Sequence, residues 1–332
     1  VIAAAIMDRF SRTMIGLRSR AGRGEHPPVV GMSRVLMASA LTYPTTSGGT
    51  LIMTRAMDPE VADAIWAAIE PILPIPADEH PLGCHNPRVP DRVCFRGILI
   101  RLVTGSSWVD IEAIMNFEVS DTTLRTRRDE WIAAGVFDHL EAEARAGYDR
   151  IIELDMDVVA IDGSLHKAPY GGEGTGKSPV DRGKLGWKWS VASERSGIPV
   201  GWSIDGANRN DVVLLDPTLD SIAANGLLNE IGTLTLDRGY DFPKIRNQLH
   251  ARGLVELDIQ RRGTKPPPGA PHRLTLGLRW IVEATNTWWS NYGQLRRSTD
   301  RKTRHRHAAL QLATVVLIVG RLIDYRNRWS PA

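Results

Sequence analysis

The order of apolar patterns after residue 150 is the feature that most restricts the fold of this chain. Three segments rich in Val, Ile and Trp, separated by Gly and Pro, are typical of strands. A helix-like segment follows them, then strand, helix and strand again, and a long helical region starts at about residue 278. The predicted strands are 157–164, 186–194, 199–205, 233–237 and 254–260, and the predicted helices between them are 210–226 and 242–253.

This element order is that of a ribonuclease H-like α/β fold, a mixed five-stranded sheet flanked by helices. In that fold the first strand is central and lies beside the fourth. A small all-helical region of the helix-turn-helix kind is expected before it. The predicted division is a poorly ordered extension over 1–52, a helical DNA-binding domain over 53–149 and a catalytic domain over 150–328.

Three acidic residues occupy informative positions in this order. Asp162 and Asp237 close apolar runs that are predicted strands, and Glu283 lies in a predicted helix. Neighbouring strands are about 4.8 Å apart, so the two aspartates can share a metal ion and the helix can add a third carboxylate. Two Mg²⁺ ions held in this way catalyse phosphodiester chemistry, and Mn²⁺ is the other cation suited to such hard oxygen ligands. Each acid alone has a simpler structural explanation, as a turn residue, a strand-end cap or an exposed helical residue.

Residues 91–139 form a run of predicted helices. The third begins with Ser120 and Asp121, which are good N-cap residues, and continues to about residue 140. Its early basic residues suit a recognition helix in the major groove, although a small helical bundle with a charged solvent face fits the pattern equally well. The basic residues in question are Arg125, Arg127 and Arg128.

Further basic residues cluster near the three acids in the sequence. The segment 296–307 holds six Arg or Lys and two His against one Asp, and a second group follows Asp162. Such runs are usually solvated faces, but beside a phosphodiester site they suit contacts with phosphates. The candidate DNA contacts outside the helical region are Lys177, Arg182, Lys184, Arg238, Arg279, Arg296, Arg297, Arg301 and Lys302.

Several other classes of protein are disfavoured. Two cysteines exclude a disulfide-rich scaffold, and the spacing of Cys84 and Cys94 with nearby histidines fits no common zinc finger. The apolar stretch 308–323 is shorter than a membrane span and carries Gln311 and Arg321, so it is predicted to be a buried core helix. Tryptophans 187, 189 and 202 are predicted to pack in the core.

The segment GGEGTGKS, residues 171–178, matches the P-loop pattern for phosphate binding. A P-loop joins a strand directly to a helix, whereas Pro179 and Gly183 oppose a helix here. We therefore expect no ATP binding and predict a flexible, basic loop close to DNA.

The chain resembles the DDE transposases of bacterial insertion sequences, in the group numbered four/five. The resemblance covers residues 80–328 and is carried by AIDGSLHKAP, by LTLDRGYD and by RWIVEATNTWWSNYGQLRRSTDR. It implies that Asp162, Asp237 and Glu283 are the catalytic, metal-binding residues. The family's Tyr and basic positions around the glutamate fall here on Leu276 and Ser290, so Arg296 and Arg297 are expected to contact phosphates instead.

The resemblance also implies an activity and its partners. The expected reaction is cleavage at the terminal inverted repeats of an insertion sequence followed by strand transfer, with two Mg²⁺ ions as cofactors. The expected partners are double-stranded DNA, at transposon ends and target, and a second copy of the chain in a synaptic homodimer. The expected location is the bacterial cytoplasm, at the nucleoid. An inactive DNA-binding remnant and a nuclease without strand transfer are the alternatives.

Overall fold

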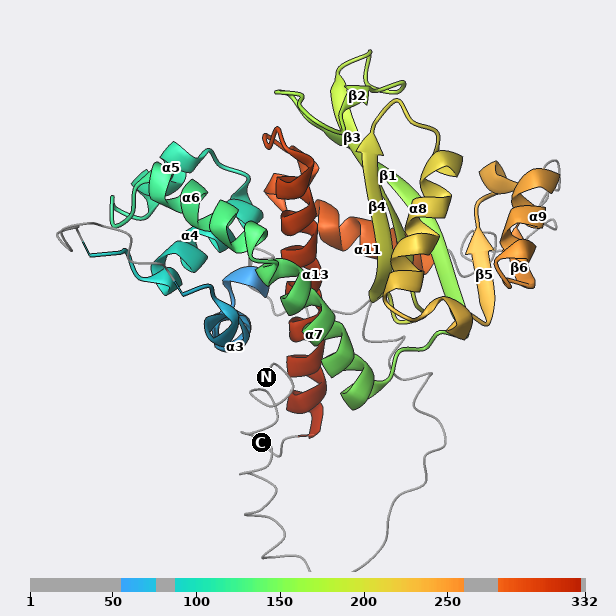
Figure 1. Cartoon of the computed structure of the whole chain (residues 1–332), viewed down its shortest axis with the longest axis horizontal. Helices are drawn as coiled ribbons and strands as arrows, with labels where there is room; N and C mark the ends of the chain where they lie inside the picture. Colours follow the sequence, from blue (N-terminus) through green and yellow to red (C-terminus); the bar gives the residue numbers. More distant parts are fainter. Residues whose placement is uncertain (1–54, 76–86, 260–279, 330–332) are drawn as a thin grey trace, which may run out of the picture.

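The structure is a computed structural model that describes residues 55–75, 87–259 and 280–329. The predicted N-terminal extension, the Cys84 region and the candidate contact Arg279 lie outside these ranges. Figure 1 shows the N-terminal helices on one side, the sheet on the other, and one long helix between them.

The N-terminal part is helical, as predicted. Ser107 starts its helix with a reciprocal capping box, and the side chain of Ser120 accepts a hydrogen bond from the amide of Thr123, as expected for an N-cap. The predicted third helix is wrong in length, because Gly135 adopts φ +69° and divides it into two. The helices are α3 (Pro59–Ile69), α4 (Asp91–Thr104), α5 (Trp108–Ile114), α6 (Asp121–Ala133) and α7 (Val136–Ile152), with short 3₁₀ turns η1 (Arg55–Met57) and η2 (Glu70–Ile72).

The sheet has the predicted mixed order, with its first strand at the centre. β1 pairs antiparallel with β3 on one side and parallel with β5 on the other, and β6 extends the sheet beyond β5. β4 pairs with β3, and a two-residue strand, β2, which was not predicted, also pairs with β3. The strands are β1 (Val158–Lys167), β2 (Gly176–Lys177), β3 (Leu185–Ser193), β4 (Pro199–Gly206), β5 (Thr233–Leu236) and β6 (Glu256–Ile259).

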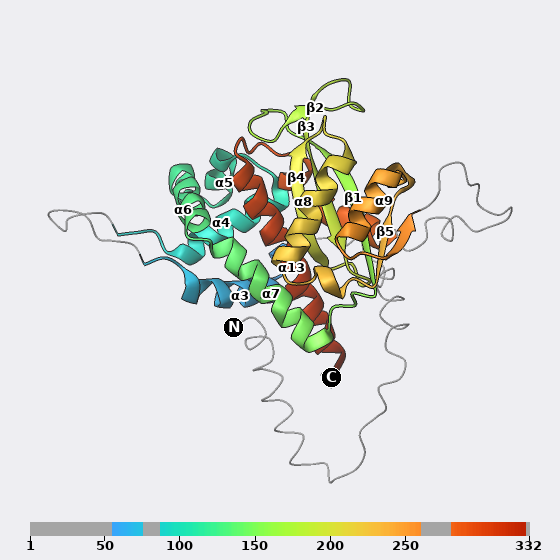
Figure 2. The same ribbon diagram turned by 45° about the vertical axis from the view of Figure 1, so that its right-hand side comes forward.

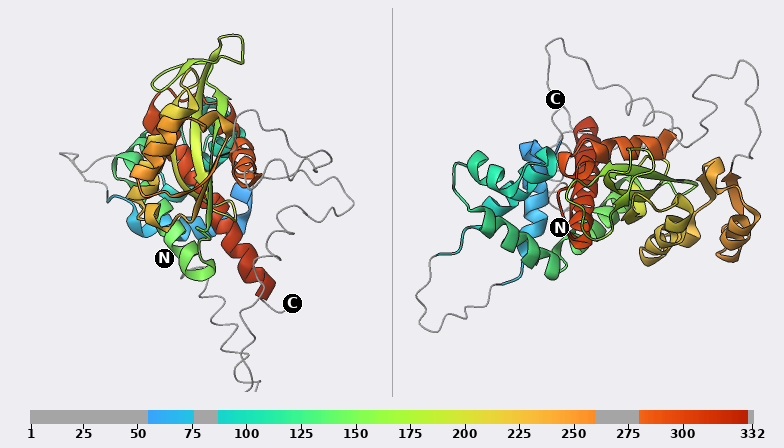
Figure 3. Two further views of the ribbon diagram at one scale, coloured as in Figure 1. Left: turned by 90° about the vertical axis from the view of Figure 1, so that its right-hand side faces the viewer. Right: turned by 90° about the horizontal axis from the view of Figure 1, so that it is seen from above.

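Helices cover both faces of the sheet. On one face, Thr218 of α8 (Asp211–Ala224) bonds to Ser190 of β3. On the other, Asn286 of α11 (Trp280–Ser290) accepts a hydrogen bond from Trp189 of the same strand. Seen from above in Figure 3, the yellow α8 and the orange α11 lie on opposite sides of the strands. The remaining elements of this part are η3 (Leu228–Glu230), η4 (Arg238–Tyr240), α9 (Pro243–Ala251) and α12 (Gly293–Arg296).

The long helix α13 (Thr303–Trp329) joins the two parts of the molecule. It crosses α7, as the two views in Figures 1 and 2 show, and also packs against α3. By length and composition it could cross a membrane, but 78% of its apolar window is buried inside the structure. The prediction of a core helix at 308–323 is therefore confirmed, and so is the burial of tryptophans 187, 189 and 202.

Candidate active site

The register of the parallel pair β1–β5 places the two candidate aspartates side by side in the sheet. Ile161 of β1 is opposite Leu236 of β5, and this is the last pair that the two strands form. Asp162 and Asp237 are therefore the next residues on two adjacent strands. Both side chains are half-buried, and Asp237 accepts a hydrogen bond from the amide of Arg238 at 2.6 Å.

One detail of the prediction needs correction, because Asp162 does not end its strand. β1 continues to Lys167, and its whole second half is held by β3, with Lys167 opposite Gly186. Asp162 instead directly follows the last residue of β1 that pairs with β5. The apolar run ends at Asp162, whereas the strand continues through Gly163.

The third acid lies on the helix that covers the face to which Asp162 belongs. Paired residues of antiparallel strands share a face, so Asp162, opposite Val191, lies on the same side as Trp189 and Ser193. Trp189 Nε1 donates to Asn286 Oδ1 at 2.7 Å, and Ser193 Oγ donates to Thr285 Oγ1 at 2.9 Å, so that side is covered by α11. Glu283 precedes Asn286 by three residues, almost one helical turn.

The donor chemistry of these three carboxylates fits a hard divalent cation such as Mg²⁺ or Mn²⁺. Within residues 55–75, 87–259 and 280–329, however, no group of three or more His, Cys, Asp or Glu side chains is gathered closely enough to hold a metal ion. The topology thus brings the three acids to one region of the sheet, but their three carboxylates are not close enough together to bind one ion.

An ion pair behind Asp162 was not predicted. Gly163 is on the opposite face, where a Cβ atom would stand 2.4 Å from Asp211 Oδ1 at the start of α8. Asp211 in turn accepts from Lys188 Nζ at 2.6 Å, and Lys188 is only 4% exposed. Gly163 therefore lets α8 approach β1 directly behind the candidate site. A glycine inside a strand pattern was the one signal for this close approach.

His166 lies on the Asp162 face of β1 and stacks on Trp189 with a ring separation of 3.6 Å. Burial lowers the pKa of His166 to about 3, so the imidazole is neutral at physiological pH. Its Nε2 atom is buried and has no hydrogen-bond partner in the part of the chain that the structure describes. The residue packs the site wall rather than carrying charge. Nothing in the sequence marked it.

Two candidate DNA contacts are in fact part of the core. Arg127 is 3% exposed and pairs with Asp91 and Glu130, and Arg128 is 7% exposed and pairs with Asp129 at 2.9 Å. Burial lowers the pKa of both guanidinium groups, and the neighbouring carboxylates oppose this shift. We therefore correct their assignment to that of structural residues.

The other described candidates are on the surface. Arg125 is exposed on α6 and pairs with Asp121 at 2.6 Å, an i,i+4 contact that a phosphate can displace at small cost. Arg238 follows Asp237 directly. The exposed candidates are Arg125, Lys177, Arg182, Lys184, Arg238, Arg296, Arg297, Arg301 and Lys302.

The P-loop-like segment does not have P-loop geometry. Gly176 and Lys177 form β2, which pairs antiparallel with β3, and residues 179–184 form a turn that leads back into β3. Lys177 is thus on a hairpin and not at the N-terminus of a helix, where a phosphate-binding lysine belongs.

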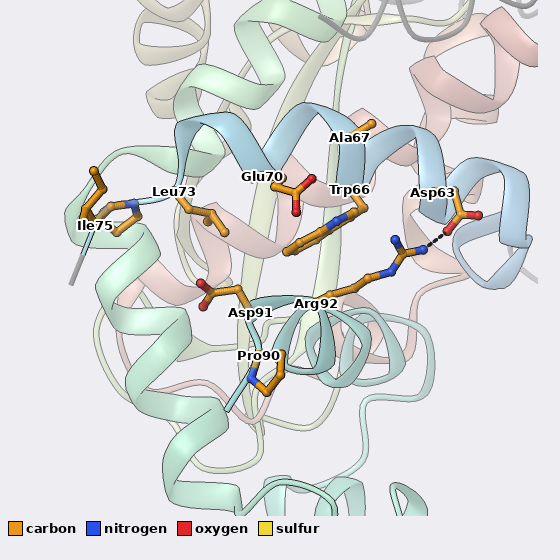
Figure 4. Close-up of a pocket in the computed structure, with 10 residues that line it drawn as sticks. Asp63, Trp66, Ala67, Glu70, Leu73, Ile75, Pro90, Asp91 and Arg92 are labelled. Atoms are coloured by element: carbon orange, nitrogen blue, oxygen red, sulfur yellow. Dashed lines mark hydrogen bonds and ion pairs between the residues drawn. The ribbon is translucent and has the colours of Figure 1, made fainter. Parts of the chain in front are cut away.

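An open cavity of about 720 Å³ lies elsewhere, between α3 and the start of α4 (Figure 4). Trp66 and Arg92 line it, and Arg92 pairs with Asp63 at 2.5 Å. Glu70 and Asp91 also line it, so its acidic character disfavours a phosphate ligand. It contains none of the candidate site residues.

Among solved structures, the chain is similar to a pre-cleavage Mos1 transpososome, with 10% identity, coverage of 76% of this chain and 82% of that chain, and a TM-score of 0.23. A Mos1 paired-end complex with Mn gives the same identity and TM-score over 77% of this chain and 83% of that one. These scores are too low to support any conclusion about the chain.

Comparison with protein families is informative. The family model described as "Putative transposase of IS4/5 family" matches residues 61–140, and the model described as "Transposase DDE domain" matches residues 153–318. The chain is 30% identical over 180 residues to the "Putative transposase for insertion sequence element IS402" of Burkholderia cepacia, covering 52% of this chain and 80% of that protein. An IS402 16.2 kDa protein of the same organism is 34% identical over 121 residues, covering 36% of this chain and 82% of that protein. The chain belongs to the IS4/5 family of DDE transposases.

Proposed function

We propose that this transposase binds the terminal inverted repeats of an insertion sequence, cleaves a strand at each end and joins the released 3′-OH to target DNA. The observation that carries the proposal is the β1–β5 register, which puts Asp162 and Asp237 on adjacent strands beneath the helix of Glu283.

In this proposal Asp162, Asp237 and Glu283 hold two Mg²⁺ ions, for which Mn²⁺ can substitute. When bound to these carboxylates, the ions would supply activation of the attacking oxygen and stabilisation of the leaving oxygen in an in-line displacement. The rest of the site orients them: Trp189 and Ser193 fix α11 through Asn286 and Thr285, and the packed ring of His166 excludes water from the wall.

The exposed cations hold the DNA through its phosphates, which fixes its position without reading its sequence. Residues 53–149 are proposed to be a helical DNA-binding domain in which Arg125 remains available, and residues 150–328 the catalytic domain. Two copies of the chain act together, since both element ends are processed in one complex. The proposed location is the bacterial cytoplasm, at the nucleoid.

The test is cleavage of labelled terminal-repeat DNA in Mg²⁺ by Asp162→Asn, Asp237→Asn and Glu283→Gln proteins. Each is expected to lose cleavage while retaining DNA binding. Asp258→Asn, an exposed acid on the next strand, is the matched control and should cleave normally. Undiminished cleavage by Asp237→Asn contradicts the assignment. Cleavage without joining to a target plasmid indicates a nuclease, and binding without cleavage by the wild type indicates an inactive remnant.

A further inference from the structure

The glycine-rich loop, residues 171–178, is docked on the segment that precedes and opens α13, residues 297–306. The amide of Glu173 donates to the carbonyl of Arg301 at 2.9 Å, and the Glu173 carboxylate accepts from the amide of Thr303 at 3.1 Å. Next to the loop, Lys167 forms a parallel bridge with Arg297. Two segments far apart in the sequence thus form one surface.

A buried arginine holds this contact together. Arg306 is 1% exposed, and its guanidinium donates to the carbonyls of Gly171, Glu173 and Asp300. It also donates to Ser298 Oγ at 3.4 Å and lies over the ring of Trp187. No carboxylate in the described part of the chain forms an ion pair with Arg306. Its hydrogen bonds therefore go to the main chain of the loop and of the segment beneath it.

The glycines of the motif are explained by this docking. Gly171, Gly172 and Gly174 all have positive φ, which side chains rarely adopt. At Gly172, with φ +107°, a Cβ atom would stand 2.2 Å from the carbonyl oxygen of Arg301. The loop can approach the segment this closely only with glycine at that position.

Exposed basic side chains belong to both segments that form the contact. Lys177, Arg182 and Lys184 belong to the hairpin that the loop opens, and Arg301 and Lys302 belong to the segment on which the loop is docked. We infer that Arg306 is a positioning residue: it locks the glycine-rich loop to residues 297–306, so that these two basic groups act as one surface for the DNA backbone. This inference rests on the proposed function for its ligand, but not for the docking itself.

Docking is tested first without DNA, by trypsin cleavage after Lys177, Arg182 and Lys184 in the full chain. Gly172→Ala is expected to raise the cleavage rate at least about tenfold, since it opens the contact. Gly183→Ala is the matched control, because Gly183 also has positive φ (+72°) but has nothing within 4 Å of a Cβ atom. Arg306→Lys keeps the charge but cannot reach three carbonyls, so it should also release the loop. Wild-type cleavage rates in both Gly172→Ala and Arg306→Lys overturn the inference.

The DNA part is tested by the salt dependence of binding to a terminal-repeat duplex. Replacing Lys177, Arg182 and Lys184 with Ala should lower the slope of log affinity against log salt by up to about 2.7, or 0.9 for each lost phosphate contact. Gly172→Ala should lower it by a similar amount and add little to the triple variant. A wild-type slope in Gly172→Ala, with a reduced slope in the triple variant, overturns the positioning role and leaves the proposed function intact. Absence of DNA binding by the wild type overturns the proposed function and this DNA role, while trypsin still decides the docking.

Discussion

Asp300 is the buried acid that ties the N-terminal helices to the segment after α11. Its side chain is 3% exposed and accepts from Arg101 at 3.0 Å and from Gln294 at 2.8 Å, with Arg128 at 3.6 Å. Burial alone would raise the pKa of Asp300, but Arg101, Gln294 and Arg128 together hold it below its ordinary value. The carboxylate is therefore ionised and neutralises two buried guanidinium groups.

Asp300→Ala should cost about 3–5 kcal/mol of folding free energy, because it leaves Arg101 and Arg128 buried without that carboxylate. That is a large share of the ~5–15 kcal/mol that stabilises a typical protein. Asp63→Ala is the control. It breaks an ion pair of 2.5 Å whose partners are 60% and 65% exposed, which should cost less than about 1 kcal/mol.

The measurement is urea denaturation followed by circular dichroism, with the midpoint and the slope compared for wild type and both variants. A loss of less than about 1 kcal/mol in Asp300→Ala would show that the buried cluster does not stabilise the joint between the two parts. An equal loss of folding free energy in both variants would show that the burial of an ion pair does not determine how much its removal destabilises the fold.

Three further changes test other contacts. Asn286→Leu removes the 2.7 Å hydrogen bond from Trp189, so the rate of single-turnover cleavage should fall about tenfold while DNA affinity stays within about twofold. Adding Trp189→Phe to this variant should reduce the rate little further. Full additivity of the two changes would contradict a shared role in holding α11. Gly163→Val places side-chain atoms against Asp211, and we expect it to lower the folding free energy, measured by thermal denaturation, by about 1–3 kcal/mol. An unchanged melting temperature would mean that α8 has room to move. Burial raises the pKa of Glu194 to about 7, against hydrogen bonds from the amides of Ser196, Ile198 and Asp155. Because this folded-state pKa is above the ordinary value of 4.5, the wild type should lose stability relative to Glu194→Gln, on the order of 3 kcal/mol, as pH rises from about 4.5 to 7. A pH-independent difference in urea midpoints would contradict this.

Much of the α/β part could be predicted because its signals are local. Short apolar runs define the strands, and the element order predicts that β1 lies beside β5. The central helix was also predicted, although the charged ends of α13 hid its full length from Thr303 to Trp329.

The errors came from contacts between distant segments. A basic helix pattern does not show which side packs inward, so the burial of Arg127 against Asp91 and of Arg128 near Asp300 could not be foreseen. The close approach of Gly163 to Asp211 and the docking of Gly172 on Arg301 depend on the same kind of contact. The sequence showed only that glycines were present.

Metal binding by the acidic residues is the central claim, and replacing one ligand with a softer one tests it most directly. Asp237→Cys should abolish terminal-repeat cleavage in Mg²⁺ and restore part of it in Mn²⁺, because a thiolate is a poor ligand for Mg²⁺ and a better one for Mn²⁺. Asp258→Cys, on the neighbouring strand, should cleave normally with either ion. Wild-type cleavage by Asp237→Cys in Mg²⁺ would contradict the assignment of Asp237 as a metal ligand.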